Sequence, residues 1–248
     1  MKMNSIQELN MTQILSIQWL MNVSRYIIIV GGSYLIFWRL LKHKLNIKTH
    51  NPNSIKFKNI KREFLYSLQT LTLFLIPTYL IMEYSKIGVF KVYYDINDMS
   101  LTWYFLSYVC SFFLHDTYFY WTHRLLHTKP FFKFHSIHHK SLYPTPFAAF
   151  AFNATEGIIQ SFAFVFISLL IPLHISTFMI FTLYSLIHNV YGHLGMDILS
   201  KERMEQFPFR YFNHPTHHGW HHRYARGNYG LYLRFWDRIM GTWKGGLK

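Results

Sequence analysis

The apolar residues of this chain are gathered into a few long runs, and that segregation limits the folds available to it. Half of the 248 residues are hydrophobic, yet the mean hydropathy is only +0.08 because charged residues lie between the runs. A transmembrane helix needs about 20 consecutive, mainly apolar residues. The sequence therefore predicts a single all-α integral membrane domain (1–248), where this length alone would suggest one or two soluble domains.

Four parts of this domain can be predicted from the order of the runs. We expect three N-terminal spans within 14–121, a polar segment at 122–146, an apolar hairpin at 147–190 and a cap at 191–248. Each arm of the hairpin is short for a full crossing, so we expect it to be tilted or re-entrant. The predicted fold is a multipass helical bundle of about four to five spans or hairpin arms, with a helical cap.

The charge pattern predicts an orientation. The net charge is +14, and the segment from Lys42 to Arg62 holds seven lysines and arginines and no acid. Basic loops beside membrane spans lie on the cytoplasmic side, so this loop is expected there and residues 1–14 outside as a polar tail. The third span then brings the chain back to the cytoplasmic face. Because the basic residues flank apolar runs, we interpret them as membrane-flanking and expect no nucleic-acid partner.

Histidines recur at spacings typical of metal ligands. Two lie four residues apart, and two later clusters each have members at i, i+3 and i+4, which places their imidazoles on one helical face. Neutral imidazole is the commonest metal ligand in proteins. A single Cys110 excludes an intrachain disulfide and a cysteine-based metal site. The candidate ligands are His123, His127, His135, His138, His139, His188, His193, His218, His221 and His222.

Ten histidines suit two metal ions better than one, since a tetrahedral zinc ion takes only four ligands. An all-imidazole set suits iron, whose open positions can bind dioxygen. With apolar and aromatic surroundings, this predicts O2-dependent attack on a C–H bond of a lipid, chemistry that no side chain performs alone. We expect two Fe ions, with zinc able to replace them on purification. Asp116 and Tyr120 precede His123 on roughly its helical face, and we predict that they fix imidazole tautomers.

Several ordered motifs resemble the fatty acid hydroxylase/sterol desaturase superfamily. They are His-Asp-x-x-x-Tyr-Trp-x-His-Arg-x-x-His at 115–127, His-x-x-His-His at 135–139 and at 218–222, and His-Leu-Gly from 193. The tail adds Asn-Tyr-Gly from 228, Phe-Trp-Asp-Arg from 235 and Gly-Thr from 241. The resemblance covers residues 101–243. In one departure, many relatives carry His-Pro where this chain has Asn153-Ala154, a change expected to alter the substrate cavity.

The resemblance implies a membrane oxidoreductase with a di-iron centre that faces the cytosol. It also implies O2 as oxidant and electrons from a carrier such as cytochrome b5 or a ferredoxin, supplied by an NAD(P)H reductase. Substrates across the superfamily include sterols, fatty acyl chains, sphingolipids, alkylglycerols and carotenoids. Neither the lipid nor the choice between hydroxylation and desaturation follows from it.

Two other classes of protein could use the same histidines. A metal transporter would need its ligands near the membrane midplane, whereas these histidines are expected at one face. A zinc-dependent membrane hydrolase would normally bring a carboxylate close to the metal, and Glu156 is the one plausible candidate from the apolar region.

Overall fold

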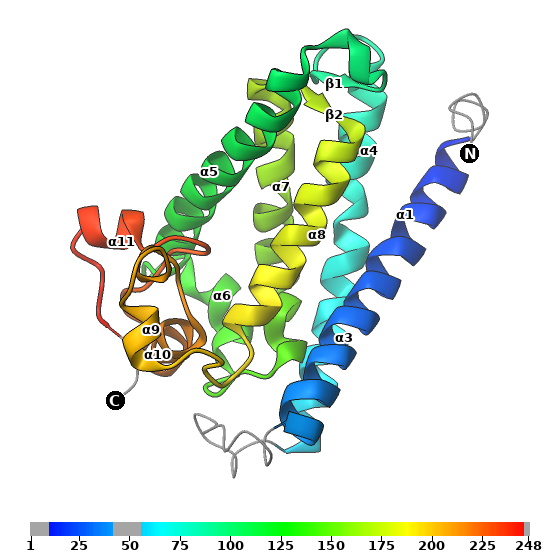
Figure 1. Ribbon diagram of the computed structural model, residues 1–248. Helices are drawn as coiled ribbons and strands as arrows, with labels where there is room; N and C mark the ends of the chain where they lie inside the picture. Colours follow the sequence, from blue (N-terminus) through cyan, green and yellow to red (C-terminus); the bar gives the residue numbers. More distant parts are fainter. Residues whose placement is uncertain (1–9, 42–55, 246–248) are drawn as a thin grey trace.

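A computed structural model describes residues 10–41 and 56–245 of the chain. The described chain is mostly helical, with long helices lying alongside one another and short helices gathered at one end (Figure 1). This confirms the predicted helical class. Most of the predicted outer tail and of the basic loop, residues 1–9 and 42–55, lie outside the described residues.

The first two predicted spans are long helical segments. In the first, α1 (Met11–Tyr26) continues without a break through the π-helical η2 (Ile27–Gly31) and η3 (Tyr34–Leu41). The second consists of α3 (Phe57–Leu73) and α4 (Leu75–Ser85). Both segments are long and apolar enough to cross a membrane.

The division between α3 and α4 has a local cause in the sequence. Pro77 has no backbone N–H to donate to the carbonyl of Leu73, and its ring crowds that carbonyl. The helix is accordingly interrupted at Phe74, between the end of α3 and the start of α4. The backbone N–H of Phe74 still donates to the carbonyl of Thr70. Pro77 is itself buried, so the break lies inside the bundle.

The third predicted span is the helix α5 (Leu101–Leu126), which begins where the side chain of Ser100 accepts the backbone N–H of Trp103. It runs five residues beyond the predicted end of the span at Trp121. Unlike the first two segments, α5 is not apolar enough to qualify as a membrane span by its composition. Polar residues such as His115 and Asp116 interrupt its apolar sequence. The number of spans therefore stays a prediction.

The predicted apolar hairpin is formed by α7 (Ala154–Leu170) and α8 (Ile175–Gly192). Its first arm starts later than expected, because residues 146–150 form a 3-10 turn, η6 (Pro146–Phe150), and residues 151–153 lack helical structure. Between the arms, β2 (Leu173–His174) pairs in parallel with β1 (Val92–Tyr93). This short pair and an isolated antiparallel bridge between Phe212 and Leu233 are departures from an all-α fold.

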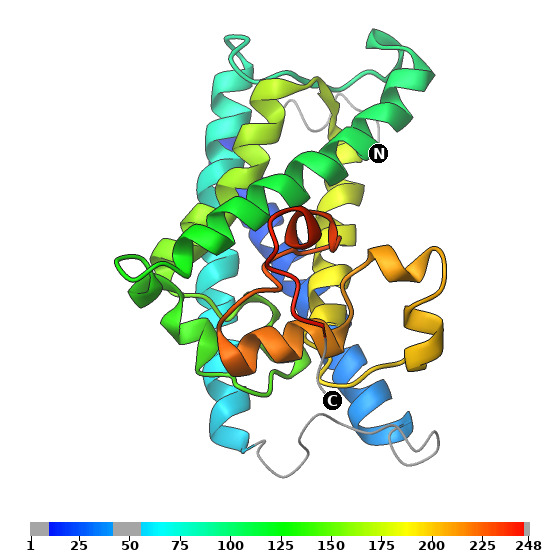
Figure 2. The same ribbon diagram turned by 90° about the vertical axis from the view of Figure 1, so that its left-hand side faces the viewer.

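Apart from η5 (Ile96–Asp98), which lies between β1 and α5, the remaining helices are short and lie at one end of the bundle (Figures 1 and 2). They are α6 (Phe132–His139), α9 (Lys201–Met204), η7 (Phe209–Tyr211), α10 (Pro215–Tyr224) and α11 (Phe235–Ile239). Loops join them, so the predicted cap is only partly helical.

The bundle and this end are tied together by buried polar contacts. Glu63 of α3 is 1% exposed and accepts hydrogen bonds from the hydroxyls of Ser141 and Thr145, in the loop that follows α6. The hydroxyl of Tyr26 donates to the carbonyl of Phe147. Buried hydrogen bonds to a carboxylate are among the stronger ones in proteins, so these contacts fix the position of α6 against the long helices.

Candidate metal centre

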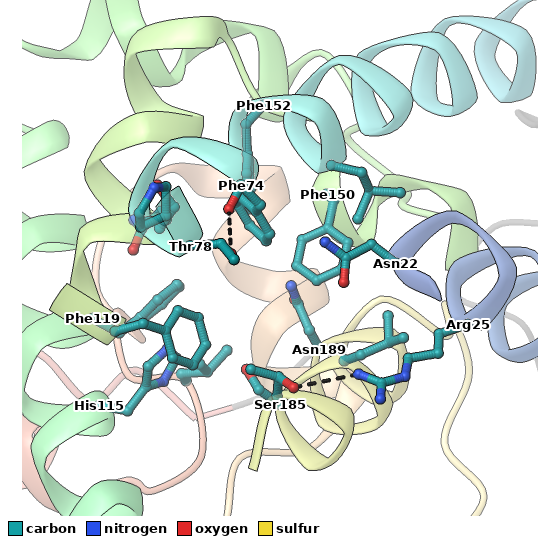
Figure 3. Close-up of a pocket in the computed structure, with 18 of the residues that line it drawn as sticks. Asn22, Arg25, Phe74, Thr78, His115, Phe119, Phe150, Phe152, Ser185 and Asn189 are labelled. Atoms are coloured by element: carbon teal, nitrogen blue, oxygen red, sulfur yellow. Dashed lines mark hydrogen bonds between the residues drawn. The ribbon is translucent and has the colours of Figure 1, made fainter. Parts of the chain in front are cut away.

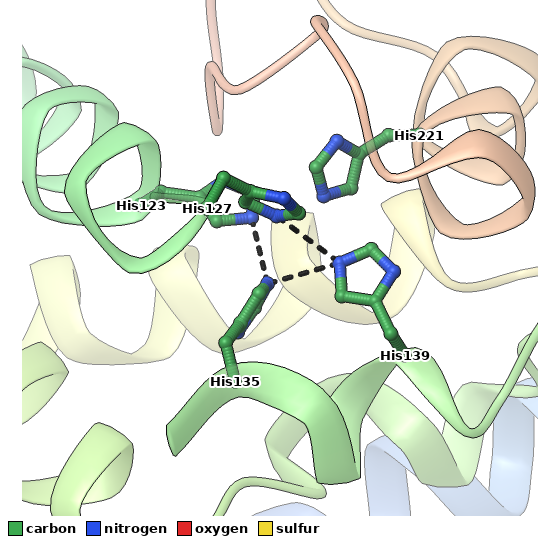
Figure 4. A group of neighbouring side chains, drawn as sticks. All are labelled: His123, His127, His135, His139 and His221. Carbon is green, nitrogen blue, oxygen red and sulfur yellow. Dashed lines mark hydrogen bonds between the residues drawn. The ribbon is translucent and has the colours of Figure 1, made fainter. Parts of the chain in front are cut away.

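The first group of histidines gathers five imidazoles from three helices (Figure 4). The Nε2 atoms of His123 and His135 are 3.0 Å apart, and the Nε2 atom of His139 lies 3.1 Å from those of His127 and His135. His221 of α10 completes the group, and its Nε2 atom is buried without a hydrogen-bond partner. One potential ligand nitrogen from each side chain lies within 4.8 Å of all the others.

The second group consists of four imidazoles that meet in the same way, from His138, His193, His218 and His222. The Nε2 atom of His193 lies 2.9 Å from that of His218, 3.2 Å from that of His138 and 3.3 Å from that of His222. The structure therefore brings nine of the ten predicted ligands together in two compact groups.

The two groups are adjacent because α6 and α10 each contribute to both. Along α6, His135 and His139 share one face and join the first group, while His138 joins the second. Along α10, His221 joins the first group, and its neighbours at i−3 and i+1 join the second. The rings of His139 and His222, one from each group, have centroids only 5.1 Å apart.

The outward nitrogens of the first group fix the tautomer of each ring. Each Nδ1 faces an oxygen acceptor at 2.5–3.3 Å and must carry the proton that it donates, so each Nε2 presents a lone pair inward. The acceptors are the carbonyls of Tyr229, Ala225, His222 and Gly227 and a carboxylate oxygen of Glu156.

Burial keeps these rings neutral. Burial lowers the pKa of His139 to about 4, and burial with the neighbouring histidines lowers the pKa of His221 and His222 well below the usual value. At neutral pH the imidazoles are therefore in the form that binds metals.

This arrangement fits metal ions. Unprotonated nitrogens only about 3 Å apart cannot hydrogen-bond to one another and repel unless a cation lies between them. Nitrogen donors with no carboxylate or thiolate among them suit Fe, Zn, Cu or Ni in preference to Mg or Ca. The first group could hold one ion through five imidazoles and the second could hold another through four.

His188 lies in neither group, which corrects its prediction as a ligand. It is five residues before His193 on α8, so the two side chains project from clearly different faces of the helix. The His188 ring packs instead against Tyr232 with centroids 4.9 Å apart, and against Tyr184 and Tyr191.

Asp116 and Tyr120 make contacts other than the predicted ones to imidazoles. Asp116 accepts hydrogen bonds from the backbone N–H groups of Tyr232 and Leu233, at 2.7 and 3.2 Å. The Tyr120 hydroxyl pairs with that of Thr242 at 3.0 Å. Both residues thus hold the C-terminal segment against α5, and the effect on the histidines is indirect.

That C-terminal segment supplies acceptors that sequence reasoning did not identify. Asp237 is fully buried and accepts from the N–H groups of Tyr229 and Gly230 and from the Thr242 hydroxyl. It therefore fixes the loop whose carbonyls at residues 227 and 229 accept from two ligand rings. The sequence signal for this loop was the presence of two motifs, Asn-Tyr-Gly from 228 and Phe-Trp-Asp-Arg from 235. The chemistry of their side chains alone did not indicate a role near the histidines.

Glu156 was also missed as a partner of the ligand set. Its carboxylate lies 2.5 Å from Nδ1 of His135, and both side chains are almost completely buried. The available signal was an acidic residue inside an apolar run, which is costly and usually functional.

A cavity lies within the helical bundle, among residues of α1, α3, α4, α5, α7 and α8 (Figure 3). Its empty volume is about 880 Å³, a figure that includes the open space at its mouth. Two lining aromatics contact ligand rings: Phe119 packs on His123 and Phe152 on His138, each with centroids 5.0 Å apart. The cavity is thus connected to His123 and His138 through the aromatic rings of its lining.

Fold and site together define a helical protein with paired all-histidine groups beneath an apolar cavity. The fatty acid hydroxylase family model matches residues 108–242. The chain is 32% identical to a lathosterol oxidase of Mus musculus over 94% of its own length and 76% of the relative's. It is 29% identical to the Homo sapiens lathosterol oxidase with the same shares covered. A Delta(7)-sterol 5(6)-desaturase of Gibberella zeae is 29% identical over 84% of this chain and 61% of that protein.

This chain belongs to the fatty acid hydroxylase family. The predicted superfamily and the predicted enzyme class, an oxidoreductase of the sterol desaturase kind, are therefore confirmed. No solved structure gives a significant match to the chain.

Proposed function

We propose that this protein is a membrane-bound enzyme that uses O2 and an external electron donor to hydroxylate or desaturate a lipid, with one iron ion in each histidine group. The observation that carries the proposal is the pair of converging imidazole groups beside a mainly apolar cavity. The relatives, which are named as sterol oxidases and desaturases, make a sterol-like lipid the first substrate to test.

The chain's own residues would hold and orient the reacting groups. The carbonyls and Glu156 hold the first group's rings in one tautomer, so the metal-facing nitrogens need no reorganisation. Phe119 and Phe152 line the cavity and contact ligand rings, so they would exclude water and position a carbon of the lipid. When bound, iron would supply the activation of O2 that no side chain provides.

Other features support this function over the alternatives. A hydrolase would need a carboxylate on the reactive side of the metal, but Glu156 lies on the outer, Nδ1 side of His135. In a transporter the ligands would lie along a passage through the bundle, whereas both groups lie at the end formed by the short helices (Figure 1).

The orientation and the span count remain part of the proposal. We infer that the bundle crosses the membrane several times and that the histidine end faces the cytoplasm. The exposed basic residues around this end support that orientation.

A direct test is turnover by the purified, iron-loaded protein. Incubation in lipid nanodiscs with lathosterol, O2 and a chemically reduced carrier should give a sterol with one more double bond or hydroxyl group, detected by mass spectrometry. Under anaerobic conditions no product is expected. A screen of membrane lipid extract would identify another lipid if lathosterol is not converted, and no O2-dependent product from either would contradict the function.

A basic surface surrounds the histidines and suits an acidic electron carrier. Residues 122–146 contain no acid, and Lys129, Lys133 and Lys140 are exposed around α6. Arg223 of α10 adjoins them, since its guanidinium lies 5.8 Å from the Tyr143 ring. Such a surface steers an acidic partner such as cytochrome b5 or a ferredoxin.

Reversing two of these charges should slow electron delivery. We expect Lys133→Glu with Lys140→Glu to lower the rate of reduction by an acidic carrier about tenfold at low salt, with less effect at high salt. The control is Lys86→Glu, at the opposite end of the bundle. Equal rates for both variants in stopped-flow measurements would contradict a carrier site at this surface.

A further inference from the structure

Two buried polar side chains of the cavity have atoms that no other part of the described chain satisfies. His115 on α5 is 6% exposed and Gln160 on α7 is 7% exposed, and both line the cavity. The His115 Nδ1 and the Gln160 Nε2 are buried without a hydrogen-bond partner. Leaving such groups unsatisfied is costly, so their presence together in one cavity indicates a ligand that completes them.

Other polar groups of the cavity differ because they have partners. The Thr78 hydroxyl donates to the carbonyl of Phe74, and the Asn189 amide donates to that of Ala149. Arg25 donates to the Thr182 hydroxyl at 3.5 Å. His115 and Gln160 are therefore distinguished from the rest of the lining by their missing partners.

The two side chains come from stretches of α5 and α7 that pack against each other. The Tyr118 hydroxyl donates to the carbonyl of Ile159 at 2.7 Å, which aligns this part of α5 with this part of α7. His115 precedes Tyr118 by one turn of α5, and the His115 ring packs on the ring of Phe164. Phe164 follows Gln160 by one turn of α7. In the other direction, Gln160 is one turn from Glu156, which holds His135.

We propose that Gln160 and His115 bind the hydroxyl group of a neutral lipid alcohol and so set which carbon of that lipid faces the histidine groups. A hydroxyl both accepts and donates, so it can take the N–H of Gln160 and satisfy His115 in either tautomer. Arg25 makes a fatty-acid carboxylate the competing occupant, because it is the one charged side chain of the cavity lining. The proposal rests on the proposed function only in taking the cavity as the substrate site.

The test is a comparison of matched lipids that differ in the hydroxyl alone. The purified full-length protein in nanodiscs is titrated with lathosterol and its 3-methyl ether, with 1-hexadecanol and its methyl ether, and with palmitate. We expect at least one alcohol to bind about tenfold more tightly than its ether. In Gln160→Leu and in His115→Phe, which retains an aromatic ring, that ratio should fall towards one.

Stability and a control variant separate ligand binding from a structural role. Replacing an unsatisfied buried group with an apolar one should leave the melting temperature of the ligand-free protein unchanged or higher. Thr78→Val, which removes a hydroxyl that already has a partner, should keep the wild-type ratio. Equal binding of each alcohol and its ether by wild type would overturn the proposal, as would variants that keep the ratio. Tighter binding of palmitate, lost in Arg25→Leu, would also overturn it.

Because binding is measured without an electron donor, the two proposals can fail separately. A protein that discriminates alcohol from ether but oxidises no lipid would remove the proposed function and leave this assignment. Turnover of a lipid that lacks a hydroxyl group, without discrimination between alcohol and ether, would support the proposed function and overturn this assignment.

Discussion

His193→Ala should reduce lipid oxidation by more than about 100-fold, beyond the usual effect of losing a group that only supports a ligand. Its Nε2 atom lies within 3.3 Å of all three other members of the second group, so no neighbour can replace it. Its Nδ1 donates to the Asn189 carbonyl at 2.7 Å, which fixes the ring toward that centre. Product formation per chain, measured by mass spectrometry after iron loading, gives the effect.

His188→Phe is the matched control on the same helix. It removes an imidazole from outside both groups and preserves ring contacts with Tyr232 and its neighbours. We expect activity within about threefold of wild type, since His188 belongs to neither histidine group and its ring contacts are preserved. A loss as large as that of His193→Ala would show that activity does not depend on membership of the two groups.

Glu156→Leu should lower the metal affinity of the first group by about 10- to 100-fold. The variant leaves the His135 Nδ1 buried without an acceptor, and it removes a negative charge that makes the ring a stronger ligand. Glu156→Gln keeps an acceptor oxygen of nearly the same size, so its loss should be smaller. Competition with a chelator, followed by metal analysis, measures both variants.

The second group provides an internal control, because Glu156 contacts none of its members among the described hydrogen bonds. We expect one metal ion to be lost early and the other to be retained as in wild type. Wild-type retention of both ions by Glu156→Leu would contradict a role for this carboxylate in metal binding.

The histidine spacing predicted most of the candidate ligands but not how they divide. Imidazoles at i, i+3 and i+4 share a face, which identified the sets on α6 and α10. Adjacent members such as His138 and His139 nevertheless join different groups, because the assignment depends on how the two helices pack. His188 was misjudged because nearness in sequence to His193 does not place both side chains on one side of a helix.

The groups that hold the rings were harder to predict. Most are backbone carbonyls, such as those of Gly227 and Tyr229, and a side-chain pattern carries no information on where a carbonyl points. Asp116 was predicted to contact imidazoles, yet its partners are N–H groups more than a hundred residues later. Such long-range contacts follow from tertiary packing.

The fold was predictable where hydropathy is strong. The helices of 11–41 and 57–85 coincide with apolar runs, and the break before Pro77 follows from proline chemistry. The late start of α7 was not foreseen, because residues 147–152 are apolar and yet form a 3-10 turn followed by a segment without helical structure. Burial of that segment against α3 and α8, a tertiary effect, overrides the hydropathy pattern.

The metal content of the iron-loaded wild-type protein tests most directly whether the histidines form two metal sites. Elemental analysis of desalted protein of known concentration should give two iron ions per chain, since each of the two groups of converging imidazoles would hold one ion. A saturating content of one ion per chain, or none, would contradict the paired centre.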